Sequence, residues 1–222
     1  MLIGHFAVAF AAKRAVPAVS LGTLFLAAQF IDGLWPIFNL LGLEHVEIAP
    51  GDTAFTPLRF VHYPITHSLL MCAVWAVLFG AAYYLVRRYR AGALMVAALV
   101  MSHWILDFVT HRPDLPLYPG GSTYLGLGLW QSVPATVAVE GALFVAGLWL
   151  YLASTRPRDR TGVIALWALV VVFLAAYFGA VFGPPPPSPD AVAWSGLAGW
   201  LTVPWGYWID QHRAYRTSPA IA

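Results

Sequence analysis

The sequence predicts an all-α protein, a polytopic transmembrane helical bundle. Of its 222 residues, 60% are hydrophobic and only 10% are charged, whereas a soluble domain has about 25% charged residues. The mean hydropathy is +0.71. Apolar stretches long enough to approach the roughly 20 residues of a spanning helix recur along the chain. We therefore expect one integral membrane domain over residues 1–222.

Seven apolar segments follow one another along the chain, and we expect six spanning helices preceded by one short N-terminal helix. The first segment is too short to span a bilayer alone, and its path stays open. The others contain enough apolar residues to cross, and the last is rich in tryptophan and glycine. The segments cover residues 2–12, 19–43, 64–86, 91–111, 129–153, 162–182 and 191–209.

The basic residues predict how the chain is oriented. If the loop after residue 86 is cytoplasmic, ten of the 12 lysines and arginines lie on that side, and only Arg59 and Arg112 lie outside. Such an asymmetry follows the positive-inside rule. It predicts a cytoplasmic C-terminus and places the loops 44–61 and 112–128, which are rich in proline and glycine, outside the cell membrane.

Several classes of protein are disfavoured by the composition. The net charge of +2 gives no indication of a nucleic-acid partner, and a single cysteine, Cys72, excludes an internal disulfide and a cysteine-based zinc site. Lys13 and Arg14 follow the first apolar stretch instead of preceding it, so no cleavable signal peptide is expected.

Ionisable residues inside the fourth apolar segment form the most informative pattern. His103, Asp107 and His111 recur at intervals of four residues, so on a helix they share one face. Imidazole and carboxylate groups in this arrangement suit zinc or another first-row metal. A structural hydrogen bond between histidine and aspartate would produce the same pattern.

The third segment opens with two more histidines, His62 and His67, on either side of Pro64. Proline is well suited to the first turn of a helix, and Thr66 or Ser68 could orient a histidine ring by hydrogen bonding. Both histidines are candidate metal ligands, although histidines at a helix start are also common as interfacial residues.

Depth in the bilayer links these candidates to two acids. With the orientation above, Asp107 lies about 6 Å and His103 about 12 Å from the outer end of their helix, and Asp32 and Glu140 lie roughly 16 Å deep in theirs. Isolated charges at such depths are costly. We therefore expect the groups to gather in the outer half of the membrane, with Asp32 and Glu140 as candidate proton acceptors and Asp32 also as a ligand. A helix-packing partner is the alternative for Glu140.

Two further residues complete the candidate site. His5 follows Gly4 near the start of the chain and is a candidate ligand. Arg112, just beyond the fourth segment, is a candidate substrate-binding residue, because arginine binds phosphate groups and lipid headgroups. A simple interfacial anchor is the alternative for Arg112.

The order of these motifs resembles the YdjM-like family, inner-membrane proteins described as metal-dependent hydrolases. The resemblance covers about residues 1–120 and leaves the last three helices, in residues 121–222, as an addition to a metal-site core. It rests on Gly4-His5, on the run from His62 to Ser68, which stands where the family has His-Arg-Gly-x-Thr-His-Ser, and on Ser102-His103 followed by Asp107.

The chain also departs from the family pattern. The family's acidic segment usually reads Pro-Asp-x-Asp-His, whereas this chain has Ile31-Asp32-Gly33, and the Arg-Gly after His62 is replaced by Tyr63-Pro64. These changes argue against a second metal and against a phosphate-binding arginine at that position. His111 could supply a compensating ligand.

Two functions are compatible with this sequence. The first is a membrane-embedded hydrolase that uses a divalent metal, most readily zinc, and acts on a lipid or lipid-linked ester or phosphodiester. The second is a non-enzymatic membrane protein whose His/Asp network forms a proton or cation pathway or a metal-stabilised scaffold. The partner that the sequence indicates is membrane lipid. The Trp-rich last segment is compatible with an interfacial belt or with a face that contacts a second copy of the chain.

Overall fold

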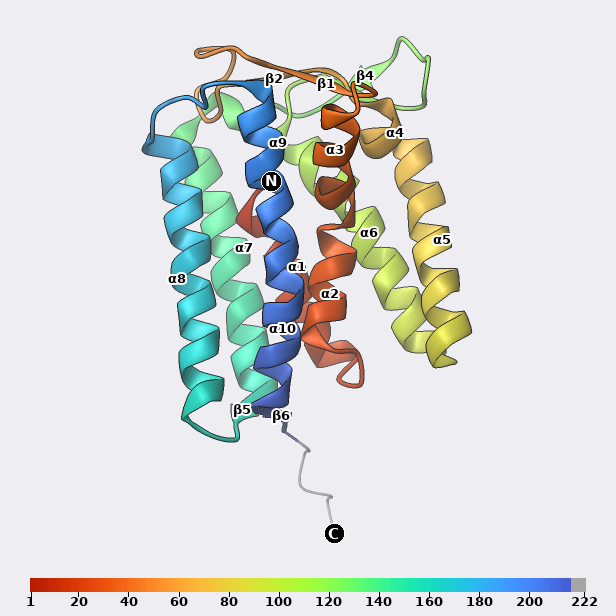
Figure 1. Cartoon of the computed structure of the whole chain (residues 1–222), viewed down its shortest axis with the longest axis vertical. Helices are drawn as coiled ribbons and strands as arrows, with labels where there is room; N and C mark the ends of the chain where they lie inside the picture. The colour runs from red at the N-terminus through yellow and green to blue at the C-terminus, as the bar shows by residue number, and fades with distance from the viewer. Residues whose placement is uncertain (217–222) are drawn as a thin grey trace.

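The computed structural model describes residues 1–216, and it is mostly helical (Figure 1). The helices run up and down the long axis of a single bundle. In chain order they are α1 (Ile3–Ala15), α2 (Leu21–Ala28), α3 (Phe30–Leu40), α4 (Pro64–His67), α5 (Leu69–Arg87), α6 (Arg90–Thr110), α7 (Val133–Ser154), α8 (Arg160–Phe182), α9 (Pro189–Ala198) and α10 (Thr202–Gln211), with 3-10 turns η1 (Leu129–Gln131) and η2 (Gly199–Leu201).

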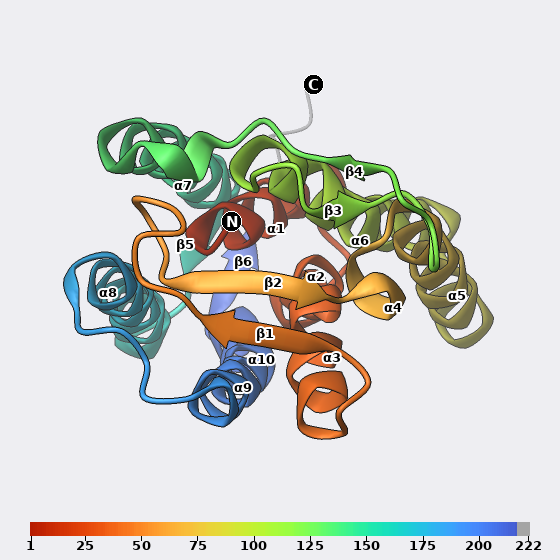
Figure 2. The same cartoon turned by 90° about the horizontal axis from the view of Figure 1, so that it is seen from above.

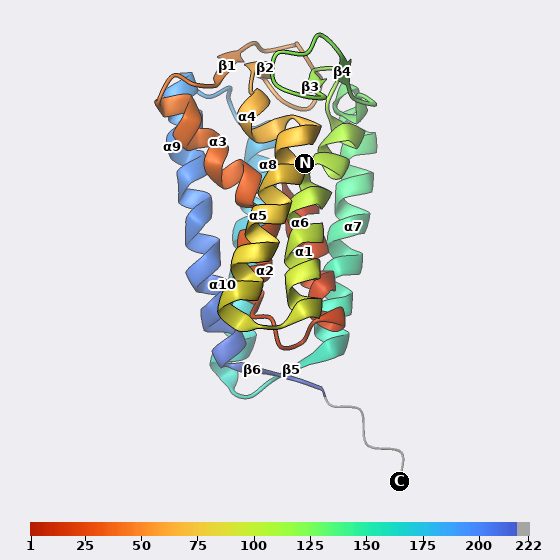
Figure 3. The ribbon, with the colours of Figure 1, turned by 90° about the vertical axis from the view of Figure 1, so that its right-hand side faces the viewer.

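Within residues 1–216, four helices, α5, α6, α7 and α8, are long and apolar enough to cross a membrane, and a fifth span is added if α2 and α3 count as one bent span. The expected sixth span is not established by length and composition. It corresponds to α9, η2 and α10, which follow one another without a loop and extend along the bundle beside α3 and α2 (Figure 3).

Short antiparallel strand pairs close the two ends of the bundle (Figure 2). At one end lie the hairpin of β1 (His45–Ile48) and β2 (Leu58–His62) and the pair of β3 (Leu115–Pro116) and β4 (Tyr124–Leu125). At the other end β5 (Thr155–Pro157) pairs with β6 (Arg213–Tyr215). The chain's C-terminus falls in residues 217–222, outside the described residues.

Helix α1 is the expected short N-terminal helix, and it is almost entirely buried in the middle of the bundle. It packs closely along α7, where a side chain at Gly147 would collide with the backbone of Ala7. Small residues allow such close approach between membrane helices. Lys13, near the end of α1, is buried and donates to Asp210 of α10 at 2.7 Å.

The second apolar segment is not the single helix that the sequence suggested. It is interrupted at Gln29, and α2 and α3 meet at an angle of 53°. Backbone groups released inside a membrane must find partners within the protein. Here the carbonyl of Ala28 accepts a hydrogen bond from His103 Nδ1 at 3.0 Å, so the break in one helix orients a histidine of another.

Aromatic rings fill the bundle interior between this break and the β5–β6 end. Phe6 contacts Phe25 and Phe173, and Phe10 contacts Phe25 and Tyr151, with ring centroids 4.0–5.3 Å apart. These five residues, which we call the aromatic plug, are all buried. Close aromatic packing of this kind leaves little room for water.

The buried ion pair at the β5–β6 end gives a test of the fold. Asp210 Oδ2 accepts from Lys13 and from the backbone N–H of Leu21, each at 2.7 Å. Asp210→Ala leaves the buried Lys13 ammonium with the carbonyl of Val19 as an acceptor but without its carboxylate counter-charge, so we expect the free energy of unfolding in detergent to fall by about 3 kcal/mol. The control is Asp190→Ala, at the exposed start of α9, where the loss should stay below about 1 kcal/mol. Equal losses would contradict this account.

Candidate metal centre

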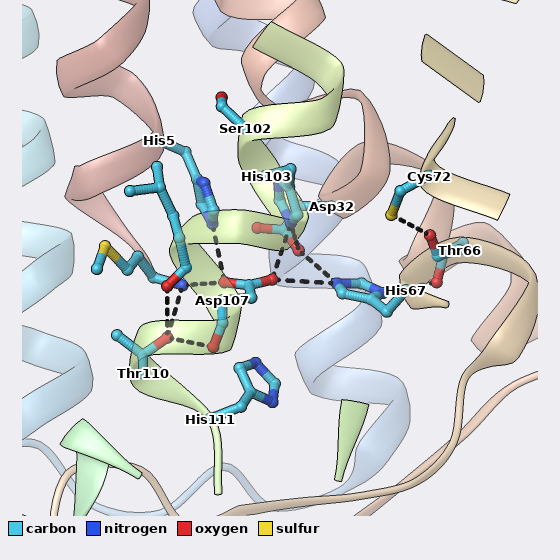
Figure 4. A network of polar contacts seen from close by, with 12 residues as sticks. His5, Asp32, Thr66, His67, Cys72, Ser102, His103, Asp107, Thr110 and His111 are labelled. Atoms are coloured by element: carbon cyan, nitrogen blue, oxygen red, sulfur yellow. Dashed lines mark hydrogen bonds and ion pairs between the residues drawn. The ribbon is translucent and has the colours of Figure 1, made fainter. Parts of the chain in front are cut away.

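Five of the predicted side chains converge on one point in the bundle (Figure 4). His103 and Asp107 project from the same face of α6, as their spacing of four residues requires. His5 comes from α1, Asp32 from the first turn of α3 and His67 from the end of α4. Four helices that are remote in sequence therefore supply the cluster, which we call the His/Asp cluster.

Two carboxylates and two imidazoles form the centre of the His/Asp cluster. His103 Nε2 lies 3.4 Å from Asp32 Oδ1 and 3.2 Å from Asp107 Oδ2. His67 Nε2 lies 3.5 Å and 3.7 Å from the same two oxygens. The other oxygen of Asp107 lies 3.1 Å from His5 Nε2 and also contacts the α-amino group of Met1.

The ring of His103 is held so that one nitrogen remains available. Its Nδ1 donates to the carbonyl of Ala28, which leaves the lone pair on Nε2 directed at the carboxylates. The side chain is fully buried, and Nε2 has no hydrogen-bond partner among the described residues. The ring of His5 stacks on that of His103 with centroids 3.8 Å apart, which restricts both rings.

His67 is oriented by a relay that begins at a buried acid. Thr66 Oγ1 donates to Glu44 Oε2 at 2.6 Å and lies 2.7 Å from His67 Nδ1, so the hydroxyl accepts the imidazole proton. The other oxygen of Glu44 accepts from the backbone N–H groups of Ile65 and Thr66, at 2.8 Å each. The relay leaves His67 Nε2 free on the side of the carboxylates, which is how ligating histidines are usually supported.

Glu44 was not recognised in the sequence as part of the site. It stands immediately after an apolar segment, where an acid is ordinarily exposed to solvent, yet it is fully buried. Its partners are main-chain N–H groups at the start of a four-residue helix, α4. A sequence pattern gives no indication of so local a contact.

The donor atoms fit a metal ion. Metal bonds to histidine and carboxylate ligands are about 2.0–2.2 Å long, so two ligands of a tetrahedral ion stand about 3.4 Å apart. The four distances between imidazole and carboxylate atoms, 3.2–3.7 Å, bracket that value. Two overlapping groups, one of His5, His103 and Asp107 and one of Asp32, His67 and His103, are close enough to hold an ion.

The His/Asp cluster is accessible from one direction. The side chains of His5, His67, His103 and Asp107 are at most 3% exposed, whereas that of Asp32 is 40% exposed. Asp32 lines a partly open cavity of about 590 Å³ that also reaches His67 and Asp107. A molecule in this cavity would therefore meet Asp32 first.

Glu140 is buried, as its depth suggested, but it contacts a different part of the structure. Its Oε2 accepts from the backbone N–H groups of Leu2, Ile3 and Gly4, at 2.9–3.2 Å. These are N–H groups at the start of α1, which have no partner within the helix. The structure thus gives Glu140 the role of capping α1, and neither group of candidate ligands includes it.

His62 is not brought to the His/Asp cluster. It is exposed at the end of β2, opposite His45 of β1. Strand β2 ends at His62 and helix α4 begins at Pro64, so the chain changes direction between these two residues. His62 and His67 therefore do not share a helix face.

His111 and Arg112 belong to a separate polar network under the β1–β2 hairpin. His111 Nδ1 lies 2.9 Å from Asp114 Oδ1, and Arg112 donates to Asp114 at 3.2 Å and to Asp52 at 2.8 Å. Burial raises the pKa of the Asp114 carboxyl, but hydrogen bonds from His111, Tyr63 and Arg112 together lower it by more. The resulting pKa is below its usual value. Arg112 is thus already paired with two carboxylates.

A comparison with protein families places the chain in a membrane-protein family. The model of a family described as YdjM inner membrane protein matches residues 1–182. The match extends beyond the motifs near the N-terminus and includes α7 and α8. No curated protein and no solved structure matches the chain.

The Glu44 relay makes a prediction about metal affinity. Glu44→Gln removes the charge that holds the Thr66 hydroxyl and hence the His67 ring, so we expect affinity for a divalent ion to fall about 10- to 100-fold. Glu47→Gln, at an exposed position of β1, should leave the affinity for the ion unchanged. Titration with zinc in detergent measures both. Unchanged affinity in a folded Glu44→Gln protein would show that the relay does not support a ligand.

Proposed function

The chain belongs to the YdjM inner membrane protein family, and we propose that it is a membrane-embedded hydrolase that depends on a divalent metal, with zinc favoured. Its substrate would be a lipid or lipid-linked ester or phosphodiester. One observation carries the proposal: buried imidazole nitrogens whose other ring atoms are already engaged lie 3.2–3.7 Å from two carboxylates, at the edge of an apolar cavity.

Three of the buried residues would hold the metal. His67, His103 and Asp107 provide two imidazoles and a carboxylate, a ligand set that occurs in catalytic zinc sites with an open position. His5, against the second oxygen of Asp107, keeps that carboxylate in place. A bound divalent ion would polarise the scissile oxygen and activate water.

Asp32 is the residue best suited to move a proton. It is the exposed member of the His/Asp cluster, and its Oδ1 lies 3.4–3.5 Å from both imidazoles. Hydrolysis adds the oxygen of a water molecule to the carbonyl carbon or the phosphorus, and one water proton passes to the Asp32 carboxylate. The bond to the leaving oxygen then breaks, and Asp32 returns the proton to that oxygen.

The proposed orientation follows from the basic residues. Counting α2–α3 as one span and α9–α10 as another gives six, with Arg87, Arg156 and Arg213 near the cytoplasmic face and a cytoplasmic C-terminus. The His/Asp cluster then belongs to the outer half of the membrane, below the β1–β2 hairpin. A substrate reached from that half is more readily a membrane lipid than a soluble metabolite.

Metal analysis tests the proposal directly. Protein purified in detergent without added metal should contain close to one divalent ion per chain, and His103→Ala and Asp107→Ala should lose it because each removes a buried ligand. His62→Ala is the matched control and should retain the ion, since His62 lies on the exposed hairpin. Elemental analysis of folded, size-selected protein gives the result.

Activity distinguishes the enzyme from its alternative. The loaded protein is expected to hydrolyse lipid esters or phosphodiesters, and Asp32→Asn should lower kcat by about 10²- to 10⁴-fold while the metal remains. Absence of metal from well-folded wild-type protein, even after incubation with zinc or manganese, would overturn the hydrolase. The His/Asp cluster would then be a proton-linked or structural network.

A further inference from the structure

The cavity next to Asp32 has an apolar interior that the hydrolytic chemistry does not require. It begins at the His/Asp cluster and continues between α8 and the run of α9 and α10. Its volume of about 590 Å³ is in the range of sites that hold a ligand of moderate size. Leu26, Phe173 and Val203 are among the apolar residues around it.

Small side chains make the far part of the cavity wide. Ala176 and Ala180 line it from α8, and Ser195, Gly196 and Gly199 line it from α9 and η2. Most of these residues are also exposed at the surface. Seen from above, α8 and α9 stand apart and are joined only by the loop over residues 183–188 (Figure 2). The cavity therefore opens sideways, on a surface that faces lipid if α8 spans the membrane.

The opposite end of the cavity is covered and polar. Phe55, Leu58 and Phe60 of the β1–β2 hairpin and its connecting loop lie over it, and Trp130 is beside them. The charged or titratable groups that line it are the Met1 α-amino end and the side chains of Asp32, His67, Asp107 and His111. The cavity thus has an apolar body, an opening between two helices and, at its inner end, the carboxylate of Asp32, where the proposed hydrolysis takes place.

We propose that this cavity binds one hydrocarbon chain of a membrane lipid, which enters from the bilayer between α8 and α9. This inference rests on the proposed function and specifies its substrate: a lipid whose ester or phosphoester linkage lies beside Asp32 while its chain occupies the cavity. Lipid tails are about as apolar as leucine side chains, so a hydrocarbon chain meets a similar environment in the bilayer and in this cavity. Moving a chain from bilayer to cavity therefore costs little, and selection is by shape.

The position of the opening has a consequence for the headgroup. A chain that enters sideways keeps its polar end at the level of the β1–β2 hairpin, where Arg59 pairs with Asp52 on the outer surface. The linkage between chain and headgroup then passes the exposed carboxylate of Asp32. A fully water-soluble ester would have to cross the same apolar cavity without a partner for its polar atoms.

Photolabelling of the intact protein in phosphatidylcholine nanodiscs tests the proposal. The probe is a phosphatidylcholine with a diazirine at the end of one acyl chain, present as a minor component, and labelled residues are identified by mass spectrometry. We expect labelling of Phe173, which is 4% exposed and lines the cavity. Trp149, exposed on α7, reports the lipid that surrounds the protein.

A matched pair of variants on one helix sharpens this test. Ala176→Trp fills the cavity, whereas Ala175→Trp places the same side chain at the neighbouring exposed residue, which does not line it. Relative to Trp149, labelling of Phe173 should fall roughly tenfold in Ala176→Trp, because overpacking of this size excludes the chain, and stay unchanged in Ala175→Trp. Equal labelling in both variants, or labelling confined to exposed residues in wild type, would overturn the proposal.

The labelling outcome is independent of catalysis. Asp107→Ala should still be labelled at Phe173, because the chain binds away from the ligands. A protein that holds metal but is not labelled there would refute the chain-binding site and leave the hydrolase standing. A protein that is labelled but never holds metal would retain the lipid site and refute the hydrolase.

Discussion

The carboxylate of Asp107 lies in the interior of a helical bundle, 3% exposed, and the surrounding structure depends on how its charge is compensated. A charged group at membrane depth is costly unless it is paired with other groups of the protein. Asp107 has three imidazoles around it, and each is fixed by a further partner or by stacking. The Met1 α-amino group contacts one oxygen of this carboxylate, whereas the lone pairs of His67 and His103 face its other oxygen and cannot offset the charge, which a cation bound between them would do.

Buried polar side chains in and near the His/Asp cluster satisfy the backbone where helices are interrupted. α1 begins inside the bundle, and Glu140 accepts its first N–H groups. α2 ends at a break, and His103 donates to the released carbonyl of Ala28. α4 begins beside Glu44, which accepts two of its N–H groups. Irregular backbone at membrane depth is tolerated only with such internal partners, so the contacts of His103 and Glu44 stabilise both the fold and the site.

Sequence alone was sufficient for the helical membrane bundle and for the pairing of His103 with Asp107, because hydropathy and a spacing of four residues are local properties. The estimated depth of Asp32 in the bilayer also predicted that it lies near these two residues. The positions of Glu140 and His62 could not be predicted in the same way. The contacts of Glu140 depend on where α1 begins within the bundle. The location of His62 depends on the end of strand β2, two residues before helix α4 begins. Glu44 needs a contact with one turn of α4, which no periodic pattern records.

The interior below the His/Asp cluster bears on whether the cluster is a binding site or part of a pathway for protons or cations. Phe6 and Phe10 follow His5 on α1 by one residue and by five, and with Phe25, Phe173 and Tyr151 they form the aromatic plug. A proton or cation that crossed the membrane would need a chain of polar groups or water in this region, whereas the close-packed rings carry a single hydroxyl, that of Tyr151, which is buried. The polar groups of the His/Asp cluster are instead continuous with the lateral cavity through Asp32. A centre closed on one side by aromatic rings and open on the other to an apolar cavity supports our proposal of a bound molecule over conduction.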